Sequence, residues 1–213
     1  MSKAIVIAGT DTDVGKTVVA AGLAACIDDA HYWKPVQAGH DPMTDTETAR
    51  MLSGLPAERF LPEVYCLGEA ASPHLAARME GIVVSPGQLT LPQLSAPLII
   101  ESAGGVMVPL SDNFLNIDLF VCWVMPVIIV ARTALGTINH SLLTISALRA
   151  RDVPIGGILF VGDAHEENEA IIPRLSGIRS LGRLPLLRSL DPARLHLAMQ
   201  AHVDIAAVEA LLA

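Results

Sequence analysis

The residues near the amino terminus with the clearest chemistry lie between Gly9 and the tripeptide Gly15-Lys16-Thr17. A short apolar run, Ala4 to Ala8, precedes them, and an apolar segment that suits a helix, Val18 to Ala25, follows. A strand, a glycine-bounded loop, Gly-Lys-Thr and a helix in this order predict a phosphate-binding P-loop. In such a loop the backbone N–H groups form an anion nest, and the helix directs its positive end at the phosphates. Lys16 would reach the β- and γ-phosphates, and the Thr17 hydroxyl would bind Mg²⁺.

The loop departs from the usual motif in one respect, because five residues rather than four separate Gly9 from Gly15. The alternative interpretation is an ordinary strand-to-helix turn that happens to contain Gly-Lys-Thr. The strand before the loop and the helix after it favour nucleotide binding.

Further polar residues fall where a parallel sheet would bring them to the same edge as the P-loop, beyond the carboxyl ends of its strands: Lys34, Glu101, Arg132 to Asn139, and Val161 to Asp163. Glu101 ends the apolar run Ala96 to Ile100, and an unpaired carboxylate there would be costly. Mg²⁺ beside Thr17 is the favoured partner; the alternative is a carboxylate that caps a sharp turn over residues 102–105. Asp45 opens a predicted helix, and local sequence alone favours an N-cap there at least as much as a metal ligand.

Lys34 stands between an aromatic, apolar strand and Pro35, an unusual place for a solvated lysine. Its ammonium group could hold both a transferring phosphoryl group and the acceptor. The alternative is a surface lysine at the end of a strand. His74 and His140 lie at helix starts with polar neighbours, where a hydrogen-bonded structural histidine is favoured over a general base.

The elements that must position these residues alternate between strands and helices. The apolar runs predict strands at Ala4 to Ala8, His31 to Pro35, Leu98 to Glu101, Val127 to Ala131, Ile155 to Val161 and Ile178 to Leu181. Helices are expected after the P-loop, from Asp45 to Leu52, from Pro73 to Gly81 behind the N-cap Ser72, up to Ala150, through Ala170 and Leu175, and from Asp191 to Leu212. Residues 36–42 read as a loop, and residues 62–67 are ambiguous. This order predicts one α/β domain over residues 1–213, with a doubly wound, mostly parallel sheet of the P-loop NTPase kind.

Composition narrows the possible partners and the compartment. Hydrophobic residues make up 52% and charged residues 17%, which suits a sheet buried on both faces and some surface hidden in an oligomer. The net charge of −8 argues against a nucleic-acid or membrane-surface partner. The three cysteines share no close spacing, which suits a reducing compartment. No leader is expected before the first predicted strand, and the apolar run from Leu119 to Ala131 is too short to span a bilayer. A cytoplasmic location is expected.

Several of these stretches together resemble the dethiobiotin synthase family. They are, in family order, Gly9 to Thr17, Lys34-Pro35-Val36, Ser72-Pro73-His74, Glu101 to Gly105, Pro109 to Asp112, and Leu135 to His140. The extended P-loop that begins Gly-Thr-Asp-Thr is itself quite specific to the family. The resemblance implies an ATP- and Mg²⁺-dependent ligase that carboxylates 7,8-diaminopelargonic acid with CO₂ or bicarbonate and closes a ureido ring through a phosphorylated carbamate.

The resemblance also implies roles for individual residues. Lys34 would be the catalytic lysine, and Thr17, Asp45 and Glu101 the Mg²⁺ ligands. Nucleotide-binding roles are implied for Asp13, Val14, Gly15, Lys16, Thr17, Val18, Asp45, Glu101, Ser102, Ala103, Gly104, Val161, Gly162, Pro185, Leu186 and Leu187. Substrate-binding roles are implied for Thr12, Lys34, Ala38, Gly136 and Asn139, the last two close to the subunit interface of a homodimer.

Three positions depart from the family pattern. Ser102 stands where glycine is usual, Ala38 where a substrate-contacting serine is common, and Val161-Gly162-Asp163 where an asparagine commonly contacts the base. The chief alternative is a nucleotide switch like ParA or MinD. Such switches usually carry a second lysine early in the loop, where this chain has Thr10-Asp11-Thr12. An amidoligase would need an additional glutaminase domain, which a chain of this length is not expected to hold.

Overall fold

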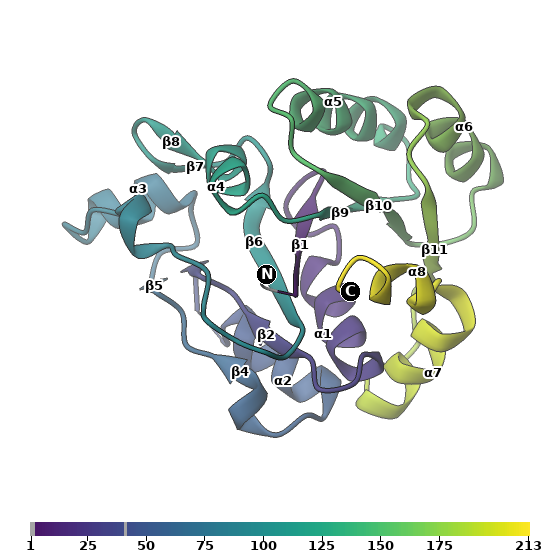
Figure 1. Cartoon of the computed structure of the whole chain (residues 1–213), viewed down its shortest axis with the longest axis horizontal. Coiled ribbons are helices and arrows are strands. Elements are labelled where there is room, and N and C mark those ends of the chain that lie inside the picture. The colour runs from purple at the N-terminus through teal and green to yellow at the C-terminus, as the bar shows by residue number, and fades with distance from the viewer. Residues whose placement is uncertain (1–2, 41) are drawn as a thin grey trace.

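A seven-stranded parallel sheet forms the centre of the computed structural model, which describes residues 3–40 and 42–213 (Figure 1). The strand order is β11-β10-β9-β1-β6-β2-β4. Its members are β1 (Ala4–Gly9), β2 (His31–Trp33), β4 (Phe60–Leu61), β6 (Leu98–Gly105), β9 (Val127–Arg132), β10 (Ile155–Val161) and β11 (Ser180–Leu184). Strand β1 lies between β6 and β9, so the P-loop that follows it leaves the middle of the sheet.

Helices cover both faces of the sheet, and the alternation of side chains along each strand supplies both cores. On β1, Ile5 and Ile7 pack with α1 (Lys16–Cys26), α2 (Asp45–Ser53), α7 (Pro192–His202) and α8 (Ile205–Glu209). Val6 and Ala8 face the other core, which includes α4 (Asn116–Trp123), α5 (Thr137–Arg149) and α6 (Glu166–Ser176). Figure 1 shows α5 and α6 on one side of the sheet and α1 and α7 on the other. The prediction of a doubly wound parallel sheet is confirmed.

Two small sheets and one short helix stand beside the main sheet. Strand β3 (Val36–Ala38) pairs in parallel with β5 (Tyr65–Leu67), and α3 (Pro73–Met79) follows. The hairpin of β7 (Pro109–Ser111) and β8 (Phe114–Leu115) leads into α4. Single 3₁₀ turns span Ala57–Arg59 and Pro86–Gln88.

Several local predictions need correction. Residues 36–38 form strand β3 rather than a loop, because they pair with the stretch that sequence left ambiguous; position 41 of that predicted loop lies outside the described residues. Residues 102–105 continue β6 instead of turning sharply, since Gly105 still pairs with Gly9 of β1. The late strand is shifted to Ser180–Leu184, and the closing helical region is split into α7 and α8 at Val203 and Asp204.

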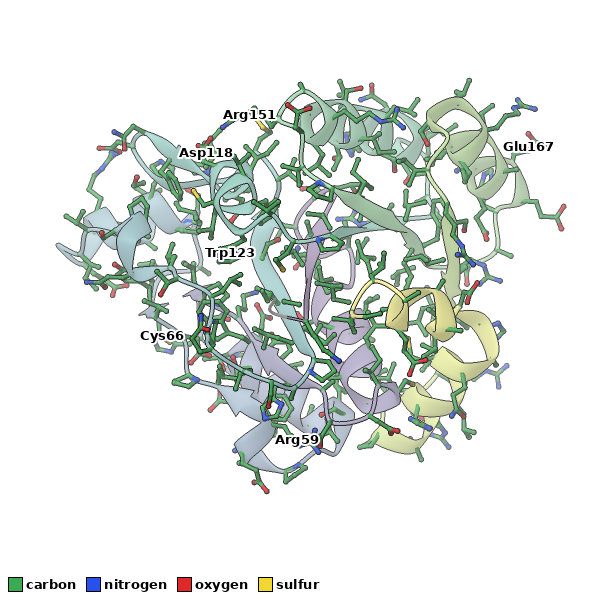
Figure 2. The ribbon with its side chains drawn as sticks, in the orientation of Figure 1. Arg59, Cys66, Asp118, Trp123, Arg151 and Glu167 are labelled. Carbon is green, nitrogen blue, oxygen red and sulfur yellow. The ribbon has the colours of Figure 1, made fainter. Side chains whose placement is uncertain are left out.

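Helix α4 was not predicted, because most of its residues belong to a long apolar run that shows no clear helical period. Its start is stabilised by Asp118, whose Oδ2 accepts a 2.8 Å hydrogen bond from the Leu115 backbone N–H. The other oxygen of Asp118 lies 2.5 Å from Arg151 Nη2, just after α5, and the two side chains are neighbours in Figure 2. This ion pair joins the end of α5 to the start of α4. Across the described part of the chain, we find no helix with the length and apolar character needed to cross a bilayer.

Candidate active site

Strand register brings Lys34 and Glu101 together. Strands β2 and β6 pair in parallel, with Trp33 opposite Ile100. The residues that follow these two are Lys34 and Glu101, so the same register places Lys34 beside Glu101. Glu101 itself lies opposite Ile7 of β1, two residues before that strand ends and the P-loop begins. Three adjacent strands therefore deliver the P-loop, the lysine and the carboxylate to one place.

Four side chains form a connected cluster, called here the Lys34 cluster: Thr17, Lys34, Asp45 and Glu101. Lys34 Nζ donates to Glu101 Oε1 at 3.0 Å and forms a second ion pair with Asp45. Thr17 Oγ1 lies 2.9 Å from Glu101 Oε1 and 3.1 Å from Asp45 Oδ1. The four residues are separated widely in sequence, and their meeting is the strongest sign of a built site.

The start of α2 holds Asp45 in place. Thr44, not Asp45, is the N-cap: its side chain accepts from the Glu47 N–H, and the Glu47 carboxylate accepts from the Thr44 N–H. This capping box corrects the favoured local interpretation of Asp45 as the cap and leaves its carboxylate free for Lys34 and Thr17. The Asp45 N–H donates to Gln37 Oε1 at 3.2 Å, which further fixes the residue.

The P-loop has the close backbone contacts that its glycines require. Gly15 has a φ of 94°, and a Cβ at Gly9 would lie 2.5 Å from the Asp11 carbonyl oxygen. Lys16 Nζ donates to that same carbonyl at 3.1 Å, so its ammonium lies over the loop. Arg132, the last residue of β9, donates to the Thr12 carbonyl at 2.8 Å and braces the loop from the neighbouring strand.

Burial and charge act in opposite directions on the ionisable groups of this site. Burial would lower the pKa of Lys34, but the carboxylates of Glu101 and Asp45 outweigh it and hold that pKa above its usual value. Burial would raise the pKa of Asp45, but Lys34 holds it below its usual value. The pKa of Lys16 is lowered, chiefly by burial, with Glu101 opposing the shift. Lys34 and Asp45 are therefore charged at neutral pH.

A cavity of about 850 Å³ opens beside the Lys34 cluster. Its lining includes most of the predicted phosphate, metal and catalytic positions: Thr12, Asp13, Gly15, Lys16, Thr17, Val18, Lys34, Ala38, Asp45, Glu101, Ala103 and Gly104. Residues that were not predicted as site residues complete the wall: Gln37, Gly39, Met43, Ala70, Ala71, Ser72, Pro73 and Val108. The volume is in the range of small-molecule sites.

Other predicted site residues lie outside this lining. Val14 is buried in the core with Val19 and Leu23, and Ser102 is buried with its hydroxyl directed at the Gly104 carbonyl. Val161 packs on the P-loop backbone, 3.1 Å from the point where a Cβ of Gly15 would stand. Gly162 and residues 185–187 follow the ends of β10 and β11. Gly136 and Asn139, at the start of α5, are exposed. For these residues the ligand-binding roles remain predictions.

The sequence reasoning missed two buried polar residues that contact the cluster, Tyr32 and Gln37. Tyr32 OH donates to Glu101 Oε2 at 2.8 Å, and burial, with Glu101 beside it, raises the pKa of Tyr32 well above its usual value. Gln37 binds the backbone of Asp45 and of Gly39. An alternation signal was available for Tyr32, because it stands two residues before Lys34 and so shares its face of the strand.

The donor set around Thr17 fits a magnesium ion. Within the described ranges no group of three or more His, Cys, Asp or Glu side chains is arranged to hold a metal. In the Lys34 cluster, one oxygen of Asp45 and one of Glu101 both lie within hydrogen-bond distance of the Thr17 hydroxyl oxygen. The hydroxyl has a single proton, so it can donate to only one of these two carboxylates at a time. All three are hard oxygen donors, and Mg²⁺ is commonly held by one or two carboxylates together with substrate phosphates.

Comparison with known proteins identifies the family. A family model described as an AAA domain matches residues 3–194. A protein of Rhizorhabdus wittichii named ATP-dependent dethiobiotin synthetase BioD is 55% identical over 201 residues, which are 94% of this chain and 96% of that protein. The chain belongs to the dethiobiotin synthetase family. Another dethiobiotin synthetase, from Agrobacterium fabrum, is 49% identical over 206 residues and covers 97% of both chains.

Solved structures of other proteins share the fold of this chain. Apo McdA from Cyanthece aligns with a TM-score of 0.60 at 12% identity, covering 99% of both chains. A chain of the MinC:MinD cell division complex of Aquifex aeolicus gives 0.57 at 15% identity, covering 98% of this chain and 95% of that one. At these identities the likeness concerns the fold alone. The resemblance to dethiobiotin synthase drawn from the sequence motifs is confirmed by the much closer dethiobiotin synthetase relatives.

Proposed function

We propose that this chain is an ATP- and Mg²⁺-dependent dethiobiotin synthetase that forms a cyclic urea from 7,8-diaminopelargonic acid and CO₂. One substrate amine adds to CO₂ to give a carbamate. A carbamate oxygen takes the γ-phosphoryl group of ATP, which releases ADP. The second amine then attacks the carbamoyl carbon, phosphate leaves with the carbon–oxygen bonding pair, and the ureido ring closes. Membership of the family and the P-loop beside the Lys34 cluster support this proposal.

The protein's contribution to phosphoryl transfer is chiefly positioning and charge neutralisation. Loop N–H groups and Lys16 bind the phosphates. Thr17, Asp45 and Glu101 would hold Mg²⁺, which neutralises charge on the phosphate oxygens when bound. Lys34 places a fixed positive charge where the carbamate and the transferred phosphoryl group would meet.

The single observation that carries the mechanism is that Lys34 lies next to the helix that follows the P-loop. Through Asp45 and Glu101 its ammonium is joined to Thr17, the residue directly after the P-loop lysine. The same cavity is lined by P-loop residues and by residues 37–39 and 70–73. A lysine between these two parts of the lining can contact both the ATP phosphates and the carbamate.

A second copy of the chain is part of the proposal. Apolar side chains are exposed just before α5 and along it, at Leu135 and Leu143, and a homodimer would cover such a surface. Gly136 and Asn139 lie in this region, so they would reach substrate from the subunit interface. Light scattering during gel filtration should give twice the 22.5 kDa chain mass.

Turnover tests the proposal directly. Phosphate release from ATP should require both 7,8-diaminopelargonate and bicarbonate and should yield dethiobiotin. A nucleotide switch would instead hydrolyse ATP without the diamine or respond to a protein partner, and either result would contradict the synthetase proposal. Repeating the assay with GTP and CTP would define the base preference left open by Val161, Gly162 and Asp163.

A further inference from the structure

We propose that Tyr32 is a positioning residue: its hydroxyl holds one oxygen of Glu101 so that the other is directed at Thr17 and Lys34. The inference rests on the proposed function, in which Glu101 is a Mg²⁺ ligand. It adds a residue outside the cavity lining to the machinery of the site.

The two oxygens of Glu101 have separate partners. Oε2 accepts from Tyr32 OH at 2.8 Å, whereas Oε1 accepts from Lys34 Nζ at 3.0 Å and lies 2.9 Å from Thr17 Oγ1. The final torsion of a glutamate side chain has a broad, roughly two-fold preference, so the backbone and rotamer alone do not orient the carboxylate. The Tyr32 hydrogen bond supplies this missing constraint, because it leaves Oε1 as the oxygen facing the P-loop helix.

Tyr32 is itself held rigidly enough to act in this way. It lies opposite Ile99 in the β2–β6 ladder, and Glu101 stands two residues further along β6, on the same face. The tyrosine ring is fully buried, and its centroid is 5.6 Å from that of Phe60 on the adjacent strand. A fixed ring places the hydroxyl at a fixed point, which is how supporting residues orient metal ligands.

The alternative role for Tyr32 is to fill the core, a role that Tyr32→Phe would preserve because the ring stays. Tyr65→Phe is a matched control at the only other tyrosine in the sequence. Tyr65 OH donates to Gln88 Oε1 and accepts from the Ser85 N–H, both at 2.9 Å, and Tyr65 is not part of the cavity lining.

Binding of a non-hydrolysable ATP analogue, measured by calorimetry with Mg²⁺ and then with EDTA, separates the two roles. We expect Tyr32→Phe to weaken Mg²⁺-dependent binding by about ten-fold, the usual effect of losing one hydrogen bond to a charged group, and to leave binding in EDTA within about two-fold. The Mg²⁺ concentration for half-maximal turnover should rise by a similar factor. Tyr65→Phe should change none of these quantities.

Two results would overturn the inference while leaving the proposed function intact. One is a Tyr32→Phe protein that matches wild type in both titrations. The other is an equal loss in Mg²⁺ and in EDTA, which indicates a packing role. If wild type bound the analogue equally well with and without Mg²⁺, the metal role of Thr17, Asp45 and Glu101 would fail, and the Tyr32 inference with it. Loss of diamine-dependent turnover in wild type would reject the synthetase proposal separately.

Discussion

Lys34 Nζ lies 3.0 Å from Glu101 Oε1, and the two side chains are only 5% and 1% exposed. A buried lysine and glutamate lose much hydration, and such pairs often contribute little net stability. The presence of two buried charges here is better explained by the site they form, since the same ammonium also binds Asp45 and the same carboxylate also contacts Thr17. The pair holds the Lys34 ammonium in a fixed, buried position beside the P-loop.

Replacing the Lys34 ammonium should therefore affect chemistry far more than nucleotide binding. We expect Lys34→Ala to lower turnover by at least ~10³, by analogy with other cations that stabilise a transferring phosphoryl group. Calorimetry should show that the variant still binds the ATP analogue. Lys3→Ala, at an exposed lysine before β1, is the control and should retain full turnover. Near-normal turnover of Lys34→Ala with nucleotide bound would refute the role given to this lysine.

The Thr17 hydroxyl should be needed for Mg²⁺ and not for the shape of the helix. Thr17→Val keeps the size and branching of the side chain but removes the oxygen, and we expect it to lower turnover by at least ~10². Thr17→Ser keeps the oxygen and should stay within about ten-fold of wild type. The measurement is the initial rate across a Mg²⁺ titration. Equal rates for the two variants would show that the hydroxyl has no part in the reaction.

Stability should depend on the charge of Asp45 in acid. Although burial raises its pKa, Lys34 outweighs that effect and holds the pKa lower in the folded protein than in the unfolded chain. The folded state then binds this proton more weakly, so the stabilisation is fully present above about pH 4 and is lost as the pH falls through the folded pKa. In urea denaturation between pH 2.5 and 7, the difference between wild type and Asp45→Asn should shrink below about pH 4.

Asp112→Asn is the control for that titration. Asp112 pairs with Arg78 at the surface, where both side chains are largely exposed, and such pairs contribute little. The variant should differ little from wild type at any pH. A constant difference between wild type and Asp45→Asn down to pH 2.5 would contradict the expected linkage.

Two glycines with positive φ should differ sharply in their tolerance of a side chain. Gly182, with φ +107°, has the His202 carbonyl oxygen 2.1 Å from the position of a Cβ, whereas Gly177, with φ +68°, has nothing within 4 Å. Gly177→Ala should cost about 1–2 kcal/mol from the left-handed backbone alone. Gly182→Ala should cost at least ~2 kcal/mol more, because β11 and the last residue of α7 must separate. Chemical denaturation measures both, and similar costs would show that the backbone at Gly182 yields without strain.

Local sequence determined the P-loop and the main architecture of this protein. Successive apolar residues in the strands, and the glycines and Gly-Lys-Thr of the loop, each act through neighbours close in the chain. The parallel sheet and the helix after the loop could therefore be predicted. Helix α4 and strand β3 were missed because an apolar run and a Val-Gln-Ala triplet carry little local signal. Helix α4 depends on the core in which its apolar residues are buried, and β3 depends on its pairing with β5.

Only tertiary structure decided which charged residues meet. The sequence motifs suggested Lys34, Asp45 and Glu101 one at a time, and local sequence alone favoured a helix cap at Asp45 at least as much as a metal ligand. Strand register placed Lys34 beside Glu101, and the Thr44 capping box released the Asp45 carboxylate toward Thr17. The position of Tyr32 two residues before Lys34 indicates a shared face of the strand, but its hydrogen bond to Glu101 depends on a strand 69 residues away. Hydrogen bonds and ion pairs act over about 3 Å, so residues separated by 11 to 84 positions become one site only when the fold closes those distances.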